Sequence, residues 1–225
     1  PMNGLLDLAL LPTVFFDEIQ LQYGAATALN GSGAIGGTLH LQSHLLQNKK
    51  KLQLEIAQHF GSFAKWHQSY KASFRFKKFS SQTTVFQQET KNNFSYINIA
   101  KAGKPKEKLE NAAAKQWGIL QENNFKINEK QDINLHFWYQ NSFRELPAAM
   151  TASASEASQK DVVLRSSINW KWQVSENATF SARTAFFKEQ ILYDNPAISL
   201  LANNIAYSWI NEIEQNIKFY NKNIF

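Results

Sequence analysis

The chain of 225 residues contains no cysteine. Without a thiol it cannot form a disulfide framework, a thiolate metal site or a cysteine nucleophile. It also lacks any run of about eighteen apolar residues, which excludes a transmembrane helix. Leu5–Val14 is apolar, but it contains Asp7 and no basic residue precedes it, so it is not a secretory signal peptide.

Basic residues are missing from the first 48 positions, and glycine is scarce after them. Residues 1–48 carry a charge of −3 and the whole chain +6, so the remainder carries +9. Six of the nine glycines also lie before position 49. This shift predicts a boundary near Ser43–Lys51, with one domain at 1–48 and a second at 49–225. The lysines and arginines of the second part are scattered singly and form no binding motif, so we expect no nucleic-acid partner.

Aromatic residues are abundant in a chain that is otherwise polar. They make up 13% of it, with 17 Phe and 6 Trp, yet the mean hydropathy is −0.40. Such a mixture is unusual for a compact core, but it suits a transmembrane barrel, which has a lipid-facing surface with aromatic girdles and a polar lumen. By composition alone, a soluble β-sandwich with large aromatic side chains is also compatible.

From Leu52 onward, about eight segments alternate between apolar and polar residues, the period of a β-strand. The clearest are 132–140, 162–174 and 205–219. Several exceed about ten residues, whereas ordinary strands have about five or six and membrane-spanning strands about nine to eleven. We therefore predict an all-β, antiparallel transmembrane sheet, which must close into a barrel because every backbone group in lipid needs a partner.

The connections between these strands are also predicted from composition. We expect a short turn at 175–177, a flexible loop at 101–110, and long outer connections at 143–161 and 194–204. Residues 112–123 are ambiguous, because three consecutive alanines favour a helix while Trp117 and Ile119 suit a strand. We predict a strand there, since its neighbours are strands.

The most specific stretch of the sequence is Glu18–Leu41, a strand, a glycine-rich turn and a second strand. Ile19 and Leu21 alternate with glutamines, and Gly31, Gly33, Gly36 and Gly37 provide backbone freedom in the turn. This stretch resembles the end of the plug domain of TonB-dependent outer-membrane receptors. The version with Tyr23 and Gly24 is most similar to the branch of vitamin B12 receptors. The resemblance implies a structural role for Tyr23, Gly24, Gly31, Gly33, Gly36 and Gly37.

The same stretch contains a second pattern, since Gly31–Gly36 fits the G-x-G-x-x-G fingerprint of dinucleotide-binding sites. That fingerprint requires a strand directly before the glycines and a helix directly after them. Small residues precede these glycines and an alternating segment follows them, so we reject a Rossmann site.

The resemblance implies that residues 1–48 are the C-terminal part of a plug and 49–225 the N-terminal, incomplete part of a barrel. Plugged transporters have about 22 strands, so this piece forms an open, curved sheet. The implied function is uptake of a scarce, large ligand, cobalamin or an iron-siderophore, across the outer membrane of a Gram-negative bacterium. The implied partners are outer-membrane lipid and a TonB-type energy-transducing protein, whose contact segment this chain lacks; a surface lipoprotein is a further one.

No catalytic, cofactor-binding or metal-binding motif is present, so we do not expect an enzyme. His40 and His44 have helical metal-site spacing, but their context is a strand end and a linker without the intervening Glu of a zinc peptidase. We expect His136 to face the lumen. Phe143, Arg144 and Met150 are the ligand-contact candidates of the outer loop, with a rim Arg–Glu ion pair as the plainer interpretation.

Two other classes of protein stay open on the sequence. One is a soluble secreted or surface β-sheet module that binds carbohydrate or protein. Its long strands would bury their apolar faces against a second layer. The other is an outer-membrane barrel hydrolase, for which no nucleophile, base and acid are recognisable.

Overall fold

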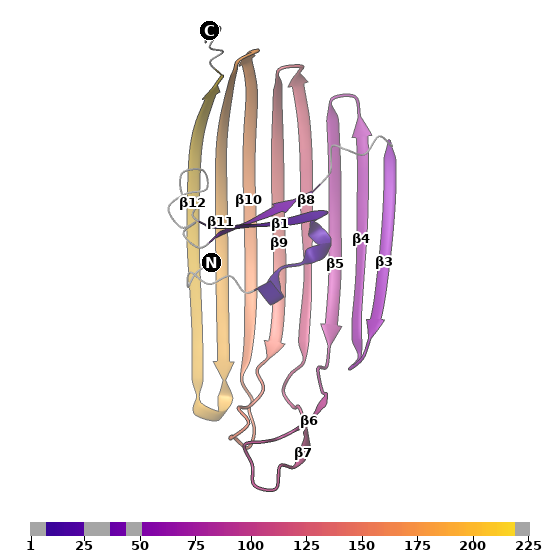
Figure 1. Cartoon of the computed structure of the whole chain (residues 1–225), viewed down its shortest axis with the longest axis vertical. Coiled ribbons are helices and arrows are strands. Elements are labelled where there is room, and N and C mark those ends of the chain that lie inside the picture. The colour runs from indigo at the N-terminus through magenta and orange to yellow at the C-terminus, as the bar shows by residue number, and fades with distance from the viewer. Residues whose placement is uncertain (1–7, 25–36, 44–50, 219–225) are drawn as a thin grey trace, which may run out of the picture.

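The computed structural model describes residues 8–24, 37–43 and 51–218. Its main feature is one antiparallel sheet of eight strands, ordered β3-β4-β5-β8-β9-β10-β11-β12 (Figure 1). The strands are β3 (Leu52–Gly61), β4 (Lys65–Phe76), β5 (Phe79–Thr90), β8 (Ala114–Asn128), β9 (Gln131–Glu145), β10 (Ser158–Ser175), β11 (Ala178–Asn195) and β12 (Leu200–Ile217). The predicted all-β fold with one large antiparallel sheet is confirmed, including the strand chosen for 112–123. None of the described helices is long and apolar enough to cross a membrane.

The two ends of the sheet differ in their connections. At one end, called the turn end, two-residue turns at 77–78, 129–130 and 176–177 join the strands. The opposite end, called the loop end, carries residues 62–64, 91–113, 146–157 and 196–199. Residues 91–113 include a small two-stranded sheet of β6 (Ser95–Ile97) and β7 (Lys106–Lys108), which Figure 1 shows beyond the ends of the long strands.

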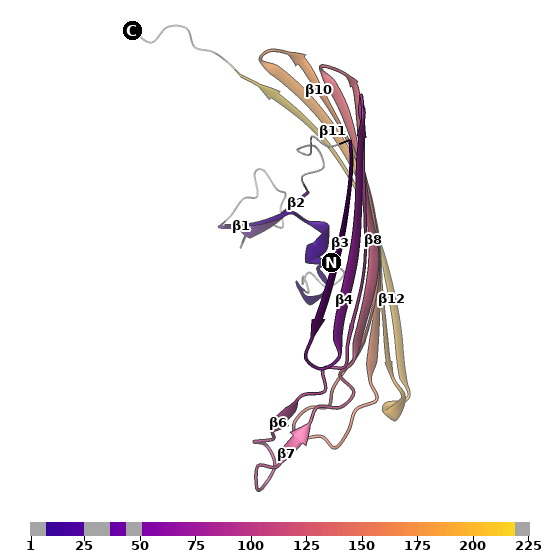
Figure 2. The same cartoon turned by 90° about the vertical axis from the view of Figure 1, so that its right-hand side faces the viewer.

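The N-terminal segment lies on one face of the large sheet. It comprises η1 (Leu8–Leu10), η2 (Thr13–Phe15), and a two-stranded ribbon of β1 (Glu18–Tyr23) and β2 (Gly37–Gln42). Figure 2 shows this segment on the side toward which the sheet curves. We call that side the concave face and the other the convex face. The predicted domain boundary falls within 44–50, outside the described residues, and stays a prediction.

Alternation assigns each side chain of the sheet to one of these faces. The ring of Phe15 packs against Phe86 and Trp138, so the even-numbered residues of β5, β8 and β9 face the concave side. The concave face is rich in polar side chains, and Thr84, Gln116, Glu122, Asn124 and Gln140 on it are buried. This explains the low mean hydropathy, because one of the two faces is polar along most strands.

The convex face is largely apolar and exposed. Trp209 and Ile213 on β12 are each 74% exposed, and among the described residues no second layer covers this face. Aromatic side chains gather at two levels. Near the turn end they are Phe74, Phe79, Phe125, Trp170, Trp172 and Phe180; toward the loop end, Trp117 packs against Tyr139. Two aromatic levels around an apolar band are typical of transmembrane β-sheets.

Three expected connections differ from the structure. The prediction of a long connection at 194–204 is wrong. β11 continues to Asn195 and β12 begins at Leu200, so only a short link with one 3-10 turn at Pro196–Ile198 joins them. The loop predicted at 101–110 contains β7, which pairs with β6. The connection at 143–161 is shorter than expected, since β9 runs to Glu145 and β10 begins at Ser158.

A glycine lets the ring of Phe86 lie flat on the neighbouring strand. A Cβ atom on Gly118 would lie 2.8 Å from the carbonyl oxygen of Tyr139 and 2.9 Å from Cε1 of Phe86. We expect Gly118→Ala to displace Phe86 and lower the free energy of unfolding by about 1–3 kcal/mol, the usual cost of overpacking. The measurement is urea denaturation of the full-length protein refolded in lipid.

The matched control is Gly61→Ala, the same substitution in another strand of this sheet. A Cβ atom there would meet only the flexible side chain of Lys65, at 3.4 Å or more. Its effect should stay within about 0.5 kcal/mol. Equal effects of the two substitutions would contradict the role assigned to Gly118.

Candidate functional site

An aromatic socket on the concave face holds the N-terminal segment. Phe15 is fully buried, and its ring meets Phe86 edge-on at 5.2 Å and Trp138 at 5.6 Å, with Leu120 completing the cluster. Burying a phenylalanine side chain stabilises a fold by about 1.5–3 kcal/mol. The guanidinium of Arg165 lies 4.8 Å from the Trp138 ring, a cation–π distance that fixes the far wall of the socket.

Polar contacts beside the socket hold the segment in one register. The side-chain amides of Gln116 and Gln140 both donate to the carbonyl oxygen of Leu10, at 3.1 and 2.6 Å. Lys71 on β4 forms an ion pair with Asp17 at 3.0 Å. Each contact joins the sheet to a backbone or side-chain group of the N-terminal segment, so they align it without adding apolar area.

A buried carboxylate on β8 binds Ser43, the residue that follows β2. Glu122 accepts a hydrogen bond from the hydroxyl of Ser43 and another from Nε2 of Gln82 at 3.1 Å. Nδ1 of His136 lies 3.3 Å from the same carboxylate. His136, which was predicted to face the lumen, lies on the concave face, and its neighbour there is the Glu122 carboxylate that also binds Ser43.

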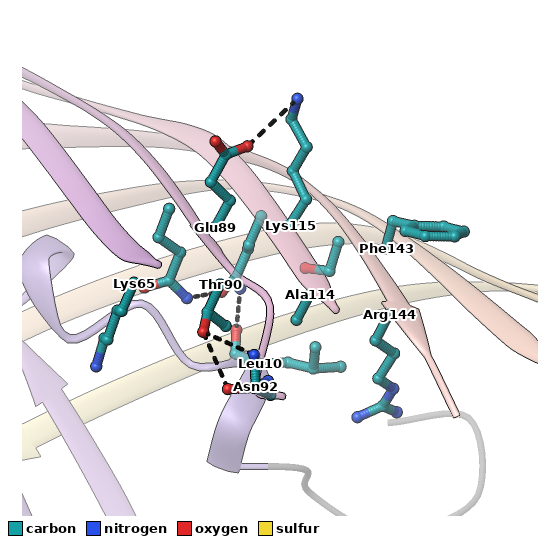
Figure 3. Close-up of a pocket in the computed structure, with 12 residues that line it drawn as sticks. Leu10, Lys65, Glu89, Thr90, Asn92, Ala114, Lys115, Phe143 and Arg144 are labelled. Carbon is teal, nitrogen blue, oxygen red and sulfur yellow. Dashed lines mark hydrogen bonds and ion pairs between the residues drawn. The ribbon is translucent and has the colours of Figure 1, made fainter. Parts of the chain in front are cut away.

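A cavity of about 230 Å³ lies at the loop end, between the N-terminal segment and the sheet (Figure 3). Its lining includes Leu10, Gln88, Gln116, Ser142, and the charged residues Lys65, Glu89, Lys115 and Arg144. Three cations against one acid favour an anionic group. Drug-sized ligands occupy about 300–1,000 Å³, so this cavity fits one end of a larger molecule.

The charges around the cavity are not equally available. Lys115 lies 3.8 Å from Glu89, on the edge that Figure 3 shows above the cavity. Arg144 lies 3.9 Å from Asp161 of β10. Lys65 extends from the first position of β4. A ligand at this site would therefore meet Arg144, which lies beside the carboxylate of Asp161, and Lys65, whose side chain is long and flexible.

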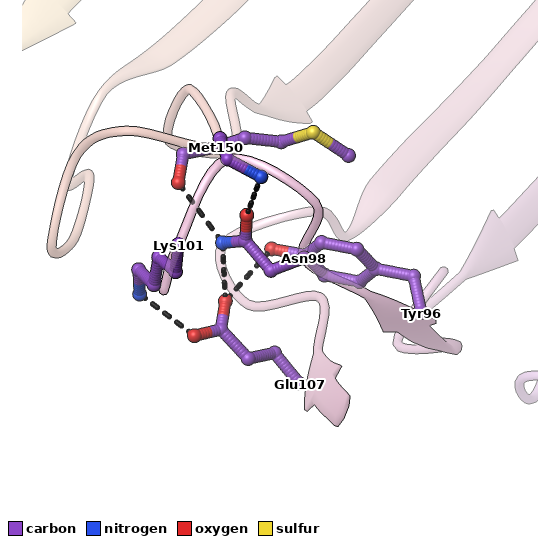
Figure 4. Close-up of polar contacts among 6 residues, drawn as sticks. Tyr96, Asn98, Lys101, Glu107 and Met150 are labelled. Atoms are coloured by element: carbon purple, nitrogen blue, oxygen red, sulfur yellow. Dashed lines mark hydrogen bonds and ion pairs between the residues drawn. The ribbon is translucent and has the colours of Figure 1, made fainter. Parts of the chain in front are cut away.

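A buried asparagine joins two connections at the loop end of the sheet (Figure 4). Asn98 is 1% exposed, and its Nδ2 donates to the Glu107 carboxylate at 2.8 Å and to the Met150 carbonyl at 2.9 Å. Lys101 and the hydroxyl of Tyr96 also bind Glu107, at 2.7 and 3.2 Å. Glu107 therefore collects three donors at the junction of residues 91–113 and 146–157.

A second asparagine closes the 146–157 loop at its base. Nδ2 of Asn111 donates to the carbonyl oxygens of Leu146 and Ala157, at 2.9 and 2.8 Å. The backbone amide of Leu146 also donates to Ala157 at 2.8 Å. The expectation of a long flexible loop is corrected here, because side chains from the preceding connection hold both its base and its middle.

These contacts shift the ionisation of Glu107. The amide of Asn98 and then the ammonium of Lys101 hold the pKa of the Glu107 carboxyl below its ordinary value. Because the folded pKa lies below the value of 4.5 expected without these contacts, the contribution of Glu107 to loop stability is present above that pH. It is lost as the pH falls through the folded pKa.

The structure brings two of the three sequence-predicted ligand contacts to one cavity. Arg144 and Phe143 both line the cavity, although their side chains leave β9 in different directions (Figure 3). Met150 lies in the outer loop, where its carbonyl oxygen meets Asn98. Arg144 lies 3.9 Å from Asp161, and the adjacent Glu145 accepts from the backbone amide of Ala113. All three residues stay predicted ligand contacts.

Part of the predicted plug signature lies within the described residues. Tyr23 is exposed, Gly24 has a φ of +95°, and a Cβ atom on Gly37, whose φ is +155°, would lie 2.6 Å from the carbonyl oxygen of Gln22. Only glycine fits at Gly37, because the two strands approach closely there. Gly31, Gly33, Gly36 and His44 lie outside the described residues. His40 lies 3.3 Å from the Thr38 hydroxyl.

Sequence reasoning missed Asn98, Asn111 and Glu122. It also missed Gln116 and Gln140, which donate to the carbonyl oxygen of Leu10. Their only signal is a polar residue on the inner face or in a loop, which many residues share. Among the described residues, no group of three or more His, Cys, Asp or Glu could hold a metal ion.

Removing the first donor to Glu107 tests the loop network. We expect Asn98→Ala to raise the pKa of Glu107 toward its ordinary value, because the lost hydrogen bond favours the carboxylate. The measurement is a ¹³C NMR titration of the Glu107 carboxyl, assigned with Glu107→Gln. Ser153→Ala, a change in the facing loop, is the control. An unchanged midpoint in Asn98→Ala would show that the network does not form.

No protein-family model matches the chain, and no curated protein matches it. Among solved structures, it is similar to the siderophore receptor PiuA from Acinetobacter baumannii, with a TM-score of 0.68 and 15% sequence identity. The match covers 91% of this chain and 32% of that receptor, so the chain spans about a third of the receptor's length. The likeness shows the fold: the eight-stranded sheet matches part of the barrel of a TonB-dependent receptor.

Proposed function

We propose that this chain is part of a TonB-dependent receptor in the outer membrane of a Gram-negative bacterium. Residues 1–48 would form the end of the plug and residues 49–225 the first part of the barrel. The observation that carries the proposal is the pairing of two surfaces on one sheet. The polar concave face holds the N-terminal segment, and the apolar convex face has two aromatic levels and no cover among the described residues.

We infer that the ligand is an iron-siderophore that reaches the cavity beside Leu10. The excess of cations in its lining supports an anionic chelate, and the structural match to a siderophore receptor agrees with it. The comparison gives no support to the vitamin B12 branch, which rested on residues near Tyr23. Binding would be followed by import into the periplasm, driven by a TonB-type protein that pulls on the plug.

Import would require the plug contacts to release. Apart from the Phe15 socket, the contacts described above are hydrogen bonds and one ion pair, which water can replace as they break. A surface lipoprotein that covers the outer loops is a further proposed partner. The structural match is with a receptor, which supports a transporter over an enzyme.

The alternative, a soluble binding module, requires a second layer over the convex face. The exposed Trp209 and Ile213 argue against it. Two adjacent serines allow a direct test, because this chain has no cysteine. Ser166 pairs with Phe137 and Phe186 on the convex face, while Ser167 pairs with His136 on the concave face.

We expect a bimane fluorophore on Ser166→Cys to be quenched by lipids brominated in their acyl chains. The same label on Ser167→Cys should not be quenched, because it faces the lumen. The measurement uses the full-length protein in brominated vesicles, with any cysteine outside this chain replaced by serine. Equal quenching at the two positions, or none at either, would refute the membrane orientation.

A second prediction concerns the ligand. Arg144→Ala should weaken binding of a ferric siderophore to the full-length receptor about 10- to 100-fold, because a hydrogen bond to a charged group contributes about 1.5–3 kcal/mol. Arg183→Ala is the matched control. Arg183 is also held by carboxylates, Glu212 at 3.5 Å and Glu214 at 2.7 Å, but it does not line the cavity.

Binding is measured by intrinsic tryptophan fluorescence with ferric catecholate, ferric hydroxamate and cobalamin as separate ligands. Arg183→Ala should keep the affinity of the unmodified receptor within about twofold. Tight cobalamin binding with no siderophore binding would overturn the ligand assignment and leave the receptor assignment intact.

A further inference from the structure

Two histidines face each other across the first two strands of the large sheet. His59 of β3 and His67 of β4 are directly opposite in the antiparallel register. Their ring centroids lie 5.6 Å apart, and the ring planes are inclined by 51°. His67 pairs in turn with Gln88 of β5, an even-numbered position, so both histidines lie on the concave face.

The separation of the two rings is close to that of two imidazoles bound to one metal ion. A Zn–N bond is about 2.0–2.1 Å long and a ring nitrogen lies about 1.1 Å from its centroid, so each centroid lies about 3.2 Å from the ion. At the tetrahedral angle of about 109°, the centroids of two such rings are about 5.2 Å apart. Because the observed distance is 5.6 Å, rotation of the side chains can bring one nitrogen of each ring to a shared ion.

A chain of hydrogen bonds sets the tautomer of His67. The carbonyl oxygen of Leu10 can only accept, and it accepts from Nε2 of Gln116 at 3.1 Å. Nε2 of Gln88 donates to Oε1 of Gln116 at 2.5 Å, which leaves Oε1 of Gln88 to accept from Nδ1 of His67 at 3.4 Å. In the neutral imidazole the proton is therefore on Nδ1, and Nε2 carries the lone pair that a metal ion needs.

The surroundings of His67 are those of a metal-binding histidine. A ligating imidazole commonly donates its other N–H to an oxygen atom, which fixes the tautomer and the orientation of the ring. The ring of His67 is also held from the side, because it stacks on Phe86 at 6.3 Å with an angle of 22°. His59 is exposed on β3, so its ring can turn toward an ion that arrives from solvent.

We propose that His59 and His67 bind a divalent transition-metal ion at the edge of the cavity beside Leu10. Imidazole suits Zn²⁺, Cu²⁺ and Ni²⁺, of which Cu²⁺ binds most tightly. Two protein ligands leave coordination positions open for water or for donor atoms of another molecule. The place at the cavity edge follows from Gln88, which lines the cavity and pairs with His67. The site depends neither on the membrane orientation nor on the proposed siderophore, so its failure would leave the proposed function intact.

Removal of the exposed ligand tests the site in the full-length protein, prepared without a polyhistidine tag. Zn²⁺ binding is measured by isothermal titration calorimetry and Cu²⁺ binding by electron paramagnetic resonance. His59→Ala should weaken Zn²⁺ binding about 100-fold or more, because a lost ligand costs at least as much as a lost partner of a ligand. The Cu²⁺ spectrum should lose the splitting from one of its two imidazole nitrogens. Since His59 is exposed, this substitution leaves the packing of the sheet intact.

His136→Ala is the matched control. His136 is also an exposed histidine of the concave face, but it lies beside the Glu122 carboxylate rather than beside a second histidine. Its removal should leave the Zn²⁺ affinity within about twofold of that of the unmodified protein.

A second substitution tests the hydrogen-bond chain. Gln88→Leu should weaken Zn²⁺ binding about 10- to 100-fold, because Nδ1 of His67 loses the acceptor that orients the ring. Gln87→Leu is the control, since Gln87 is the next residue along β5 and faces the convex side. It should leave the Zn²⁺ affinity unchanged.

Three results would overturn the proposal. They are the absence of Zn²⁺ and Cu²⁺ binding by the unmodified protein, an unchanged affinity in His59→Ala, and an equal loss of affinity in the His136→Ala control. An unchanged affinity in Gln88→Leu would refute the tautomer assigned to His67.

Discussion

The burial of one ring, Phe15, holds the N-terminal segment on one face of the large sheet. Phe15 belongs to the N-terminal segment, and its socket is formed by three strands of the large sheet. This contact identifies the concave face, and strand alternation then assigns every other side chain to one of two environments. The polar residues of the sheet lie mainly on the concave face, and its apolar and aromatic residues lie mainly on the convex face. Gly118 makes the socket fit, because no side chain could occupy the space under Phe86.

The concave face combines one apolar anchor with polar contacts. Polar contacts align the segment at three separate points along its length. They are the hydrogen bonds from two glutamines to the Leu10 carbonyl, the Lys71–Asp17 ion pair and the hydrogen bond from Ser43 to Glu122. A segment held in this way can be released by exchanging hydrogen bonds with water, while the single socket preserves its docked position. The cavity beside Leu10 shares a wall with this segment, so binding there and displacement of the segment would be coupled.

The outer loops and the convex face both depend on amide side chains. Asn98 and Asn111 make separate connections act as one unit, because each amide can bridge two carbonyl or carboxylate groups. On the convex face, Gln121 joins its neighbours in a similar way, but the surroundings are apolar. The same amide chemistry thus joins separate loop segments in one place and neighbouring strands in the other.

Much of the sheet could be predicted from local pattern. Period-two alternation located most of the long strands and put Ile133, Phe137 and Trp209 on one face and His136 on the other, since side-chain direction in a strand is a local property. The short turn near Glu176 followed from the same pattern. The turn at Pro196–Ile198 did not, because polar residues such as Asn203 and Asn204 continue β12 where composition indicated a loop.

The socket, the loop network and the Gln121–Ser81 hydrogen bond depend on pairing between distant segments. Phe15 and Trp138, Asn98 and Met150, and Ser81 and Gln121 meet only after the strands have taken their register. A local pattern gives the face on which a side chain lies, but not the neighbour that it meets there. That neighbour is fixed by register and by strand order, which are set by the packing of the whole sheet.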